Sequence, residues 1–264
     1  MGNDPEFGKG RELILETHAC FAGLVRGVSS GGERDAEPDL GGKLFWAGAL
    51  DRTGRALVMA GNVAGAATLV ATADKEAQRR AIHAGTVDFL VTSLDEALRI
   101  LKNEVRKRAT VAVCVGGSAA VVEAEISARG VEPDLFRDGV VRASRQERED
   151  RGGASGAEDA PELVAWKVEA VPAVWLPKLD ATALACLRPE EAMARRWIRL
   201  SARYLGRIGN TQHLVWSDRG FRMRFVERVR EDAWRGSIAV RGEIEAAWPG
   251  GSKRFGFGTP AEPR

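Results

Sequence analysis

A short polar turn between two glycines is the stretch of this chain best suited to hold a phosphate group. Gly48 and Gly54 bracket residues 49–53, after an apolar run of strand length and before a segment rich in small residues. Backbone N–H groups at a helix start bind anions, and glycine lets a ligand approach the backbone closely. The spacing predicts that a nucleotide, if one binds, lies over residues 48–54.

Charged and polar residues around this turn define the rest of the predicted nucleotide site. Asp51 places a negative charge where the phosphate would lie, and Arg52 and Arg55 could compensate for it. Polar residues after two other strands are expected to face the same crevice, with Asp74 or Thr72 at the ribose. The candidate cofactor-binding residues are Gly48, Thr53, Gly54, Thr72, Asp74, Gly116 and Ser118. A dinucleotide fingerprint crowds three glycines together, whereas this turn has only Gly48 and Gly54. A parallel α/β scaffold that binds no nucleotide therefore explains the same local pattern.

Alternating strand and helix signals place these residues at the carboxyl ends of strands. Residues 43–74 read as strand, turn, helix and strand, the length of one βαβ unit. The predicted fold class is α/β, with a doubly wound parallel sheet covered by helices on both faces. We expect strands at 44–50, 68–73, 88–91 and 110–115, and helices at 54–66, 74–85, 93–105 and 118–129.

The second half of the chain gives weaker signals. Residues 143–162 are charged and glycine-rich without apolar periodicity, which predicts a flexible linker. Two prolines within residues 163–179 favour an extended segment outside a sheet centre. We expect helices at 11–25, 189–207 and 219–235, strands at 213–216 and 237–240, and a loose tail after Trp248. The predicted organisation is 1–42 as the N-terminal segment of a core part, 43–142 as the sheet domain, 143–162 as the linker and 163–264 as a second α/β segment completing the core part.

Composition fits a globular protein without a metal or disulfide framework. The 264 residues are 44% hydrophobic and 29% charged, with a net charge of +2. Three widely spaced cysteines form neither a disulfide pattern nor a CxxC metal site, and Cys114 is expected in the core. No apolar run reaches about eighteen residues, so we expect no membrane segment and a cytoplasmic location.

One stretch is strongly basic. Residues 195–235 hold eleven arginines and four acidic residues, for a net charge of +7. Such a patch could bind nucleic acid or another anion. Since no aromatic platform or recognition motif accompanies it, solvated helix faces with salt bridges are the preferred interpretation, and we do not expect nucleic-acid binding.

Several stretches, in order, resemble the urocanase (urocanate hydratase) family. AGALDRTGRALVMAGNVAGAA, AGTVDFLVTSLDEAL and VCVGGSAAVVEAEISARGVEPD, with Asp138 after them, resemble its NAD-binding domain. RRWIRLSARY, HLVWSDRG and SIAVRGEIE resemble segments of its core domain. The resemblance implies a Rossmann-type NAD domain inserted in a core domain, usually in a homodimer. In this family NAD⁺ adds to the imidazole ring of the substrate so that water can attack.

The chain departs from the family pattern at positions that carry chemistry. The family's Gly-Gly-Ala-Gln-Pro is Gly54-Arg55-Ala56-Leu57-Val58 here, and its ribose-binding acid falls near Thr72, with Asp74 displaced from it. Its reactive cysteine aligns with Val215, and residues 139–143 replace a polar stretch. These losses imply that the chain does not hydrate urocanate itself.

Few ionisable candidates remain for catalysis. His213 and Asp218 flank the strand end where the family places its reactive residue, so His213 could act as a general acid or base that Asp218 orients. A surface histidine beside a helix-capping aspartate is the alternative. With Asp51, these two are the predicted catalytic residues; the other candidates are His18, His83 and Asp138.

The predicted function is a lyase- or hydratase-like tailoring enzyme acting on a small aromatic or heterocyclic metabolite. NAD is a possible cofactor, no metal is expected, and the resemblance implies a homodimer. A non-catalytic binding or assembly protein with the same fold is the main alternative. An NAD(P)-dependent oxidoreductase is a further one, although Tyr204 is the only tyrosine and no Tyr-Lys or His-acid pair stands out.

Overall fold

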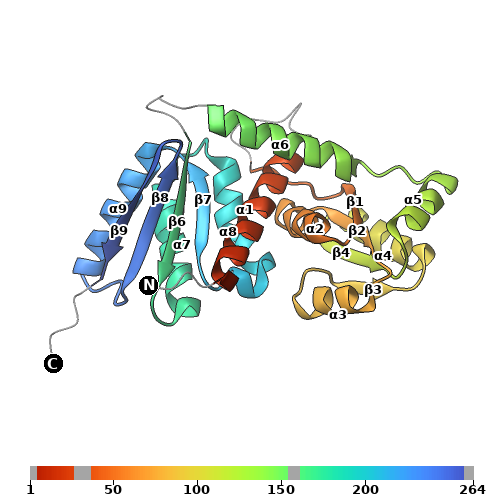
Figure 1. Cartoon of the computed structure of the whole chain (residues 1–264), viewed down its shortest axis with the longest axis horizontal. Helices are drawn as coiled ribbons and strands as arrows, with labels where there is room; N and C mark the ends of the chain where they lie inside the picture. The colour runs from red at the N-terminus through yellow and green to blue at the C-terminus, as the bar shows by residue number, and fades with distance from the viewer. Residues whose placement is uncertain (1–4, 27–36, 154–160, 259–264) are drawn as a thin grey trace. The chain divides into compact units, whose positions relative to one another are not determined.

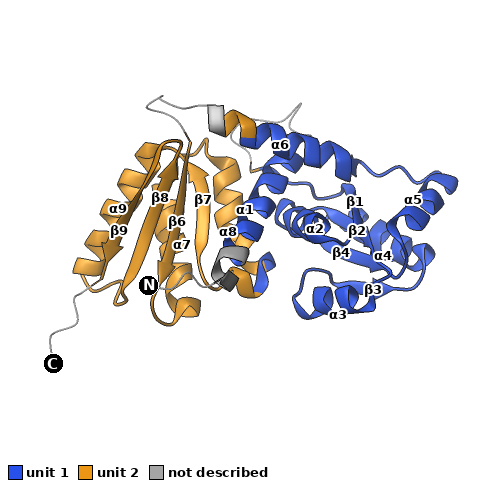
Figure 2. Ribbon diagram, in the orientation of Figure 1, with its two compact units in different colours: residues 1–33, 38–148, 204–206 blue, residues 34–37, 149–203, 207–264 orange. Residues whose placement is uncertain are grey.

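The chain divides into two compact units. The computed structural model describes residues 5–26, 37–153 and 161–258. Unit 1 comprises residues 1–33, 38–148 and 204–206, and unit 2 comprises residues 34–37, 149–203 and 207–264 (Figure 2).

Unit 1 is built on a five-stranded sheet in which every strand pairing is parallel (Figure 1). The strand order is β3-β4-β2-β1-β5, so the chain moves away from β1 in one direction and returns to its other side. This confirms the predicted doubly wound sheet. The strands are β1 (Leu44–Ala49), β2 (Ala67–Ala71), β3 (Phe89–Val91), β4 (Val111–Val115) and β5 (Leu135–Phe136).

Helices cover both faces of this sheet. Trp46 and Leu69 pack in one apolar cluster with residues of α4 (Leu94–Lys107) and α5 (Ala119–Ala128). Phe45, on the alternate face of β1, approaches α2 (Arg52–Ala64), where a Cβ on Gly61 would lie 3.3 Å from its ring. Successive residues of a strand point to opposite faces, so β1, β2 and β4 are buried on both sides, whereas the edge strands β3 and β5 are partly exposed.

Polar residues start four helices of this unit: three do so at the predicted residues 74, 93 and 118, while α2 starts earlier than the predicted residue 54. Asp51, Asp74, Ser93 and Ser118 each accept a hydrogen bond from a backbone N–H in the first turn of α2, α3 (Lys75–His83), α4 and α5 respectively. These N-caps satisfy donors that a helix start would otherwise leave unpaired.

Two further helices belong to unit 1, the second of them as far as residue 148, and correct the predicted organisation. α1 (Pro5–Arg26) packs on α2, so residues of the predicted N-terminal core segment belong with the parallel sheet. α6 (Arg137–Gly153) is helical where a linker was expected from residue 143, while residues 154–160 lie outside the described part. α6 packs on α1, where a Cβ on Gly23 would lie 2.6 Å from Ser144 Oγ.

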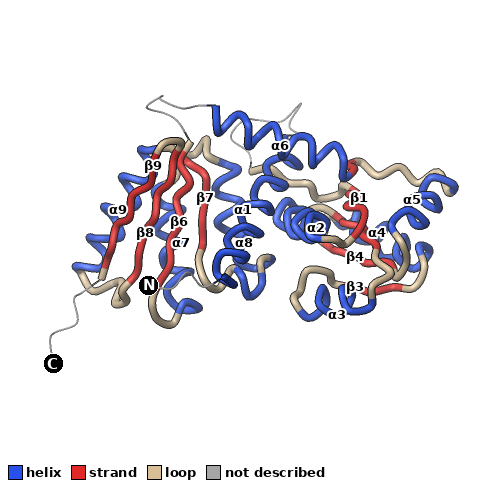
Figure 3. The backbone as a smooth tube through the Cα atoms, in the orientation of Figure 1, coloured by secondary structure: helices blue, strands red, loops and turns tan. Residues whose placement is uncertain are grey.

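Unit 2 contains a four-stranded antiparallel sheet of order β7-β6-β8-β9 (Figure 3). Trp166 of β6 packs against Phe225 of α9, with the ring centroids 5.1 Å apart, and donates a hydrogen bond to Asp180 of α7. Helices therefore bury one face of this sheet. The elements are β6 (Glu162–Val168), α7 (Pro172–Cys186), α8 (Ala192–Tyr204), a 3-10 turn (Gly206–Ile208), β7 (His213–Ser217), α9 (Arg219–Trp234), β8 (Gly242–Trp248) and β9 (Gly251–Phe257). Of these, Tyr204 and the first residue of the 3-10 turn are assigned to unit 1.

Three predictions for unit 2 are wrong. β6 is an interior strand, and the prolines that argued against a strand lie in α7, with Pro172 at the helix start, where proline is tolerated. Residues 237–240 are not a strand. Residues 251–257 of the expected loose tail form β9, because Pro249 and Gly250, the latter at φ +99°, make a tight turn back from β8, while residues 259–264 lie outside the described part.

Other expectations concern the whole chain. In the part that the structure describes, no helix is long and apolar enough to cross a membrane. The same residues hold no cluster of three or more potential metal ligands. All three cysteines are free, and Cys114 is fully buried in β4, as predicted.

Candidate functional site

The turn after β1 is shaped by two glycines with different roles. The pairing of β1 with β2 shifts register between Trp46 and Ala49, and Gly48 lies at this irregularity with φ +75°. A Cβ on Gly54 would stand 1.9 Å from Ala49 O, so only glycine lets the first turn of α2 lie this close to the strand end. The predicted glycines therefore do shape the backbone at the carboxyl edge of the sheet.

Asp51 is held by two partners. Its Oδ1 accepts a hydrogen bond of 2.7 Å from Gly54 N, and its Oδ2 accepts one of 2.7 Å from Arg137 Nη2. Partial burial disfavours the charged carboxylate, but hydrogen bonds from Arg137 and Gly54 outweigh it and hold the pKa of Asp51 below its usual value. Asp51 is therefore ionised at neutral pH and is a weak base.

Arg137, which sequence reasoning missed, fills the crevice beside β1. It follows β5 directly, and its Nη1 donates a hydrogen bond of 2.9 Å to Ala49 O. A Cβ on Gly48 would lie 2.8 Å from Arg137 Cδ, so the glycine leaves room for the arginine side chain. The available signal was its position: it is the first residue after a strand at this edge, next to Asp138.

The Asp51–Arg137 pair occupies the place where a doubly wound sheet usually binds its ligand. β1 and β5 are neighbours, and the connections from β1 and into β5 run over opposite faces, so a crevice opens between their carboxyl ends. A dinucleotide pyrophosphate there would meet the Asp51 carboxylate, which already accepts from the α2 N-terminus. The residues present do not fit NAD in this position, and NAD binding by this chain stays a prediction.

A groove of about 330 Å³ lies next to this crevice, between the starts of α2 and α3. One of its arginines is already paired, since Arg52 contacts Glu12 at 2.9 Å and Glu16 at 3.4 Å. Thr53 does not face the groove and donates to Glu16 at 3.1 Å. The groove is lined by Leu50, Asp51, Arg52, Arg55, Asp74, Ala77, Arg80 and Ala81.

Arg55 is the cation in this groove that has no carboxylate partner within 4.0 Å among the described residues. Burial lowers the pKa of its guanidinium, and repulsion from Arg80 lowers it further. Arg80 approaches Asp74 at 3.7 Å, a long and exposed ion pair. Arg55 and Arg80 together have one long ion pair, the one with Asp74, and therefore attract a further anionic group. We call these residues the Arg55–Arg80 groove.

The other predicted cofactor residues lie along the same edge but do not all meet. Thr72 Oγ1 accepts from Asp74 N at 3.2 Å, and Thr72 O accepts from Gln78 at 2.8 Å, so Thr72 braces the start of α3. Gly116 and Ser118 follow β4, which β2 separates from β1. They therefore stand outside the groove, with Ser118 capping α5.

The predicted His213–Asp218 pair is not formed. The two residues lie at opposite ends of β7, and a strand rising about 3.3 Å per residue places them roughly 16 Å apart. His213 Nδ1 instead lies 2.7 Å from Asp180 Oδ1, which also accepts from Trp166 Nε1 at 3.0 Å. Asp218 caps α9 and pairs with Arg188 at 2.7 Å.

The remaining candidates are dispersed. His18 is buried in α1 with its ring centroid 6.3 Å from that of Phe21, which makes it part of the core. His83 is exposed near the end of α3, and Asp138 is exposed in the first turn of α6. A catalytic role for His213, Asp218 and Asp51 stays a prediction.

Comparison with known proteins gives this geometry a family. Residues 20–141 match the family model described as the urocanase Rossmann-like domain. An S-methyl thiourocanate hydratase from Variovorax sp. (strain JCM 16519 / RA8) is 33% identical over 133 residues, which cover 46% of this chain and 24% of that relative. The match thus spans about a quarter of the relative's length. Together with the doubly wound sheet and its glycine-shaped turn, these matches identify residues 20–141 as a diverged urocanase Rossmann-like domain.

Proposed function

We propose that this chain has a hydratase- or lyase-like role on a small heterocyclic acid of the urocanate type, which binds in the Arg55–Arg80 groove. The observation that carries the proposal is Arg55, a half-buried guanidinium without a carboxylate partner in the described residues. A substrate of this type brings a carboxylate and a ring N–H. The similarity to a hydratase of S-methyl thiourocanate supports this choice of chemistry.

Different residues of the groove bind the carboxylate and the ring of the substrate. Arg55 and Arg80 bind the substrate carboxylate, since a guanidinium fork matches a carboxylate with two hydrogen bonds. Asp51, ionised and held by Arg137, accepts a hydrogen bond from the ring N–H. Asp51 can accept this hydrogen bond while it still accepts the one from Gly54 N that caps α2.

A second candidate function, binding without turnover, has a specific observation in its favour. Both groove carboxylates, Asp51 and Asp74, cap helices, and the pKa of Asp51 is lowered. A general base works best with a pKa near the operating pH, so a lowered carboxylate pKa favours orientation of a ligand over proton transfer.

Titration of the purified chain with urocanate and with S-methyl thiourocanate by isothermal calorimetry tests the proposal. We expect binding, and a loss of about tenfold to hundredfold in affinity for Arg55→Gln, because a buried charge-assisted contact is removed. Arg79→Gln is the matched control, since Arg79 lies on α3 outside the groove and contacts Glu76. Equal affinity in both variants would remove the groove from the proposal.

Turnover separates the two candidate functions. Loss of the ultraviolet absorbance of either compound, checked by chromatography of the product, supports the enzyme; binding without loss supports the binding protein. Mass spectrometry of the denatured protein tests for bound NAD, and light scattering after size exclusion tests the expected homodimer.

A further inference from the structure

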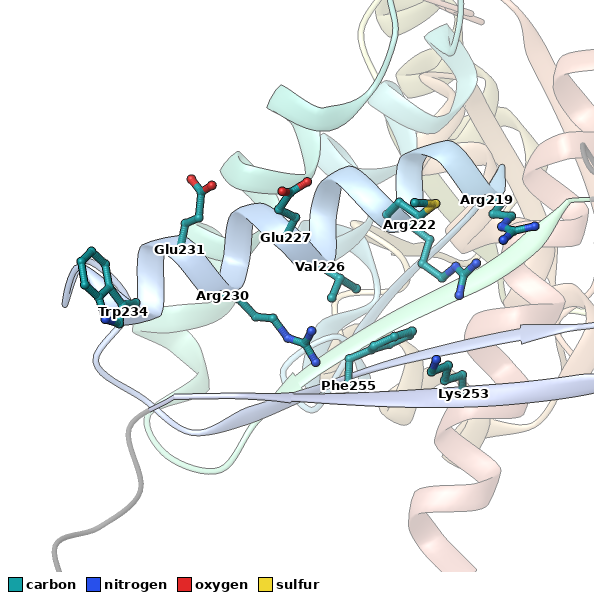
Figure 4. Close-up of a pocket in the computed structure, with 10 residues that line it drawn as sticks. Arg219, Arg222, Val226, Glu227, Arg230, Glu231, Trp234, Lys253 and Phe255 are labelled. Atoms are coloured by element: carbon teal, nitrogen blue, oxygen red, sulfur yellow. The ribbon is translucent and has the colours of Figure 1, made fainter.

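A second groove lies in unit 2, between helix α9 and strand β9, far in sequence from the Arg55–Arg80 groove. It has a volume of about 670 Å³ (Figure 4). We call it the α9–β9 groove. Its lining residues are Arg219, Arg222, Met223, Val226, Glu227, Arg230, Glu231, Trp234, Lys253 and Phe255.

One wall of this groove is an open sheet edge. β9 pairs with β8 over its whole length, from Trp248↔Gly251 to Gly242↔Phe257, and among the described strands it has no neighbour on its other side. Alternate N–H and C=O groups of β9 therefore face outward. Such an edge accepts a further strand unless the protein protects it.

The charges of the groove select what can approach this edge. Arg222 and Arg230 point from α9 toward β9, whereas Glu227 and Glu231 point away from the strand, and Arg219 lines the groove at the start of α9 (Figure 4). Arg222 is neutralised by Glu162 at 2.8 Å. Arg219, Arg230 and Lys253 have no carboxylate within 4.0 Å among the described residues. Lysine on an edge strand repels most incoming strands, but it attracts an acidic one.

The ring of Phe255 contacts two of these cations, Arg230 and Lys253, without neutralising them. The guanidinium of Arg230 lies 5.8 Å from the centroid of Phe255, and the ammonium of Lys253 lies 5.4 Å from it. Cation–π contacts of this kind orient a cation while leaving its charge available to a ligand. At the helix side, Met223 is 58% exposed and Trp234 is 88% exposed, which offers apolar surface next to the cations.

We infer that the α9–β9 groove binds an acidic peptide segment in extended conformation, which adds a strand to β9. An acidic strand uses all three features together: the free edge, the unpaired cations and the exposed apolar side chains. A single-stranded nucleic acid would use the cations but leave the edge unpaired, and the ring of Phe255 on which a base would stack is already in contact with cations.

The direct test is calorimetric titration of the full chain with an eight-residue peptide in which Glu and Val alternate. We expect binding that weakens as salt is raised, because exposed charges are screened. The same peptide with N-methyl groups on all its backbone nitrogens should lose binding, since neither of its edges can then complete a strand ladder. Unchanged binding of the methylated peptide would overturn strand addition, and binding of an oligothymidine without binding of the peptide would overturn the choice of ligand.

Matched variants locate the site. Arg230→Gln with Lys253→Gln should weaken peptide binding about tenfold or more, as two charge-assisted contacts are lost. Arg254→Gln is the control, because Arg254 neighbours Lys253 on β9 but approaches Glu243 and Glu245 at 3.7 and 3.8 Å on the opposite face. Thermal unfolding by circular dichroism verifies that all variants fold. Equal losses in the test and control variants would overturn the assignment to this groove.

Discussion

The two grooves of this protein treat their charges in opposite ways. At the carboxyl edge of the parallel sheet, Asp51 is paired with Arg137 and Arg52 with Glu12 and Glu16. In the α9–β9 groove, Arg219 and Arg230 have no such partners in the described part of the chain. Because these ion pairs neutralise Arg137 and Arg52, only Arg55 and Arg80 of the first site remain to bind an anionic ligand. In the second site only Arg222 is paired, with Glu162, and the charges of Arg219 and Arg230 remain for a ligand. A site's capacity to bind depends on which of its charges are still unpaired.

The largest expected effect is the loss of stability when a glycine near the first groove is replaced, compared with a glycine near the second. Gly54→Ala should cost about 3 kcal/mol or more of unfolding free energy, because its Cβ would stand 1.9 Å from Ala49 O and the backbone must shift. Gly256→Ala in β9 should change it by less than about 0.5 kcal/mol, since no heavy atom lies within 4 Å of that Cβ. Urea unfolding followed by circular dichroism measures both, and equal costs would contradict the tight contact at Gly54.

Removing one arginine from each groove tests the contrast in pairing. Arg137→Ala should destabilise the protein by about 1–2 kcal/mol, because it removes the ion pair with Asp51 and packing over Gly48. Arg219→Ala removes no ion pair and should stay within about 0.5 kcal/mol of the unchanged protein. The same urea experiment compares them, and a larger loss for Arg219→Ala would reverse the comparison.

Acid titration sharpens the account of Asp51. Its pKa in the folded protein is below the usual 3.8, so the ionised form stabilises the fold above that pH, and this stability is lost as pH falls through the lowered pKa. Asp51→Asn keeps an acceptor for Gly54 N but removes the charge. Its deficit relative to the unchanged protein should be below about 1 kcal/mol at pH 7, because the pair is half exposed, and should shrink as pH falls below 3.8 through the lowered pKa. A deficit independent of pH would exclude the charge as its cause.

The smallest perturbation is chemical labelling of the three thiols. Burial raises the pKa of Cys20 to about 12 and that of Cys114 to about 11, so neither forms an appreciable thiolate at pH 8. Cys186 in unit 2 is partly exposed, although burial raises its pKa as well. Native alkylation with iodoacetamide, read by mass spectrometry, should modify Cys186 first. Early modification of Cys20 would indicate opening of α1.

Local signals in the sequence were sufficient for the framework of unit 1. Continuous apolar runs predicted the buried strands β2 and β4, and helices were expected to start at Asp74, Ser93 and Ser118, which are N-caps in the structure. These features depend on neighbours within a few residues, so a single sequence contains them. The turn at residues 48–54 was predicted because its two glycines are local features of this kind.

The missed features depend on contacts between residues far apart in the chain. Arg137 meets Asp51 across 86 residues, and Asp180 meets His213 across 33. α6 was mistaken for a linker because the face it buries carries Val140, Ser144 and Glu147, at helical spacing but without an apolar stripe. Hydrophobic periodicity detects a helix only when its buried face is apolar.

The distribution of tryptophan gives each unit its own optical reporter. Trp46 is the one tryptophan of unit 1, 2% exposed beneath α4 and α5, while the other six of the seven belong to unit 2. The tryptophan emission of a Trp46→Phe variant, excited where Tyr204 of unit 1 does not absorb, would come from unit 2 alone. The difference between its fluorescence and that of the unchanged protein would isolate unit 1. Unfolding of the urocanase-type sheet could thus be followed separately from that of the unit with the basic groove, in one chain and without an added label.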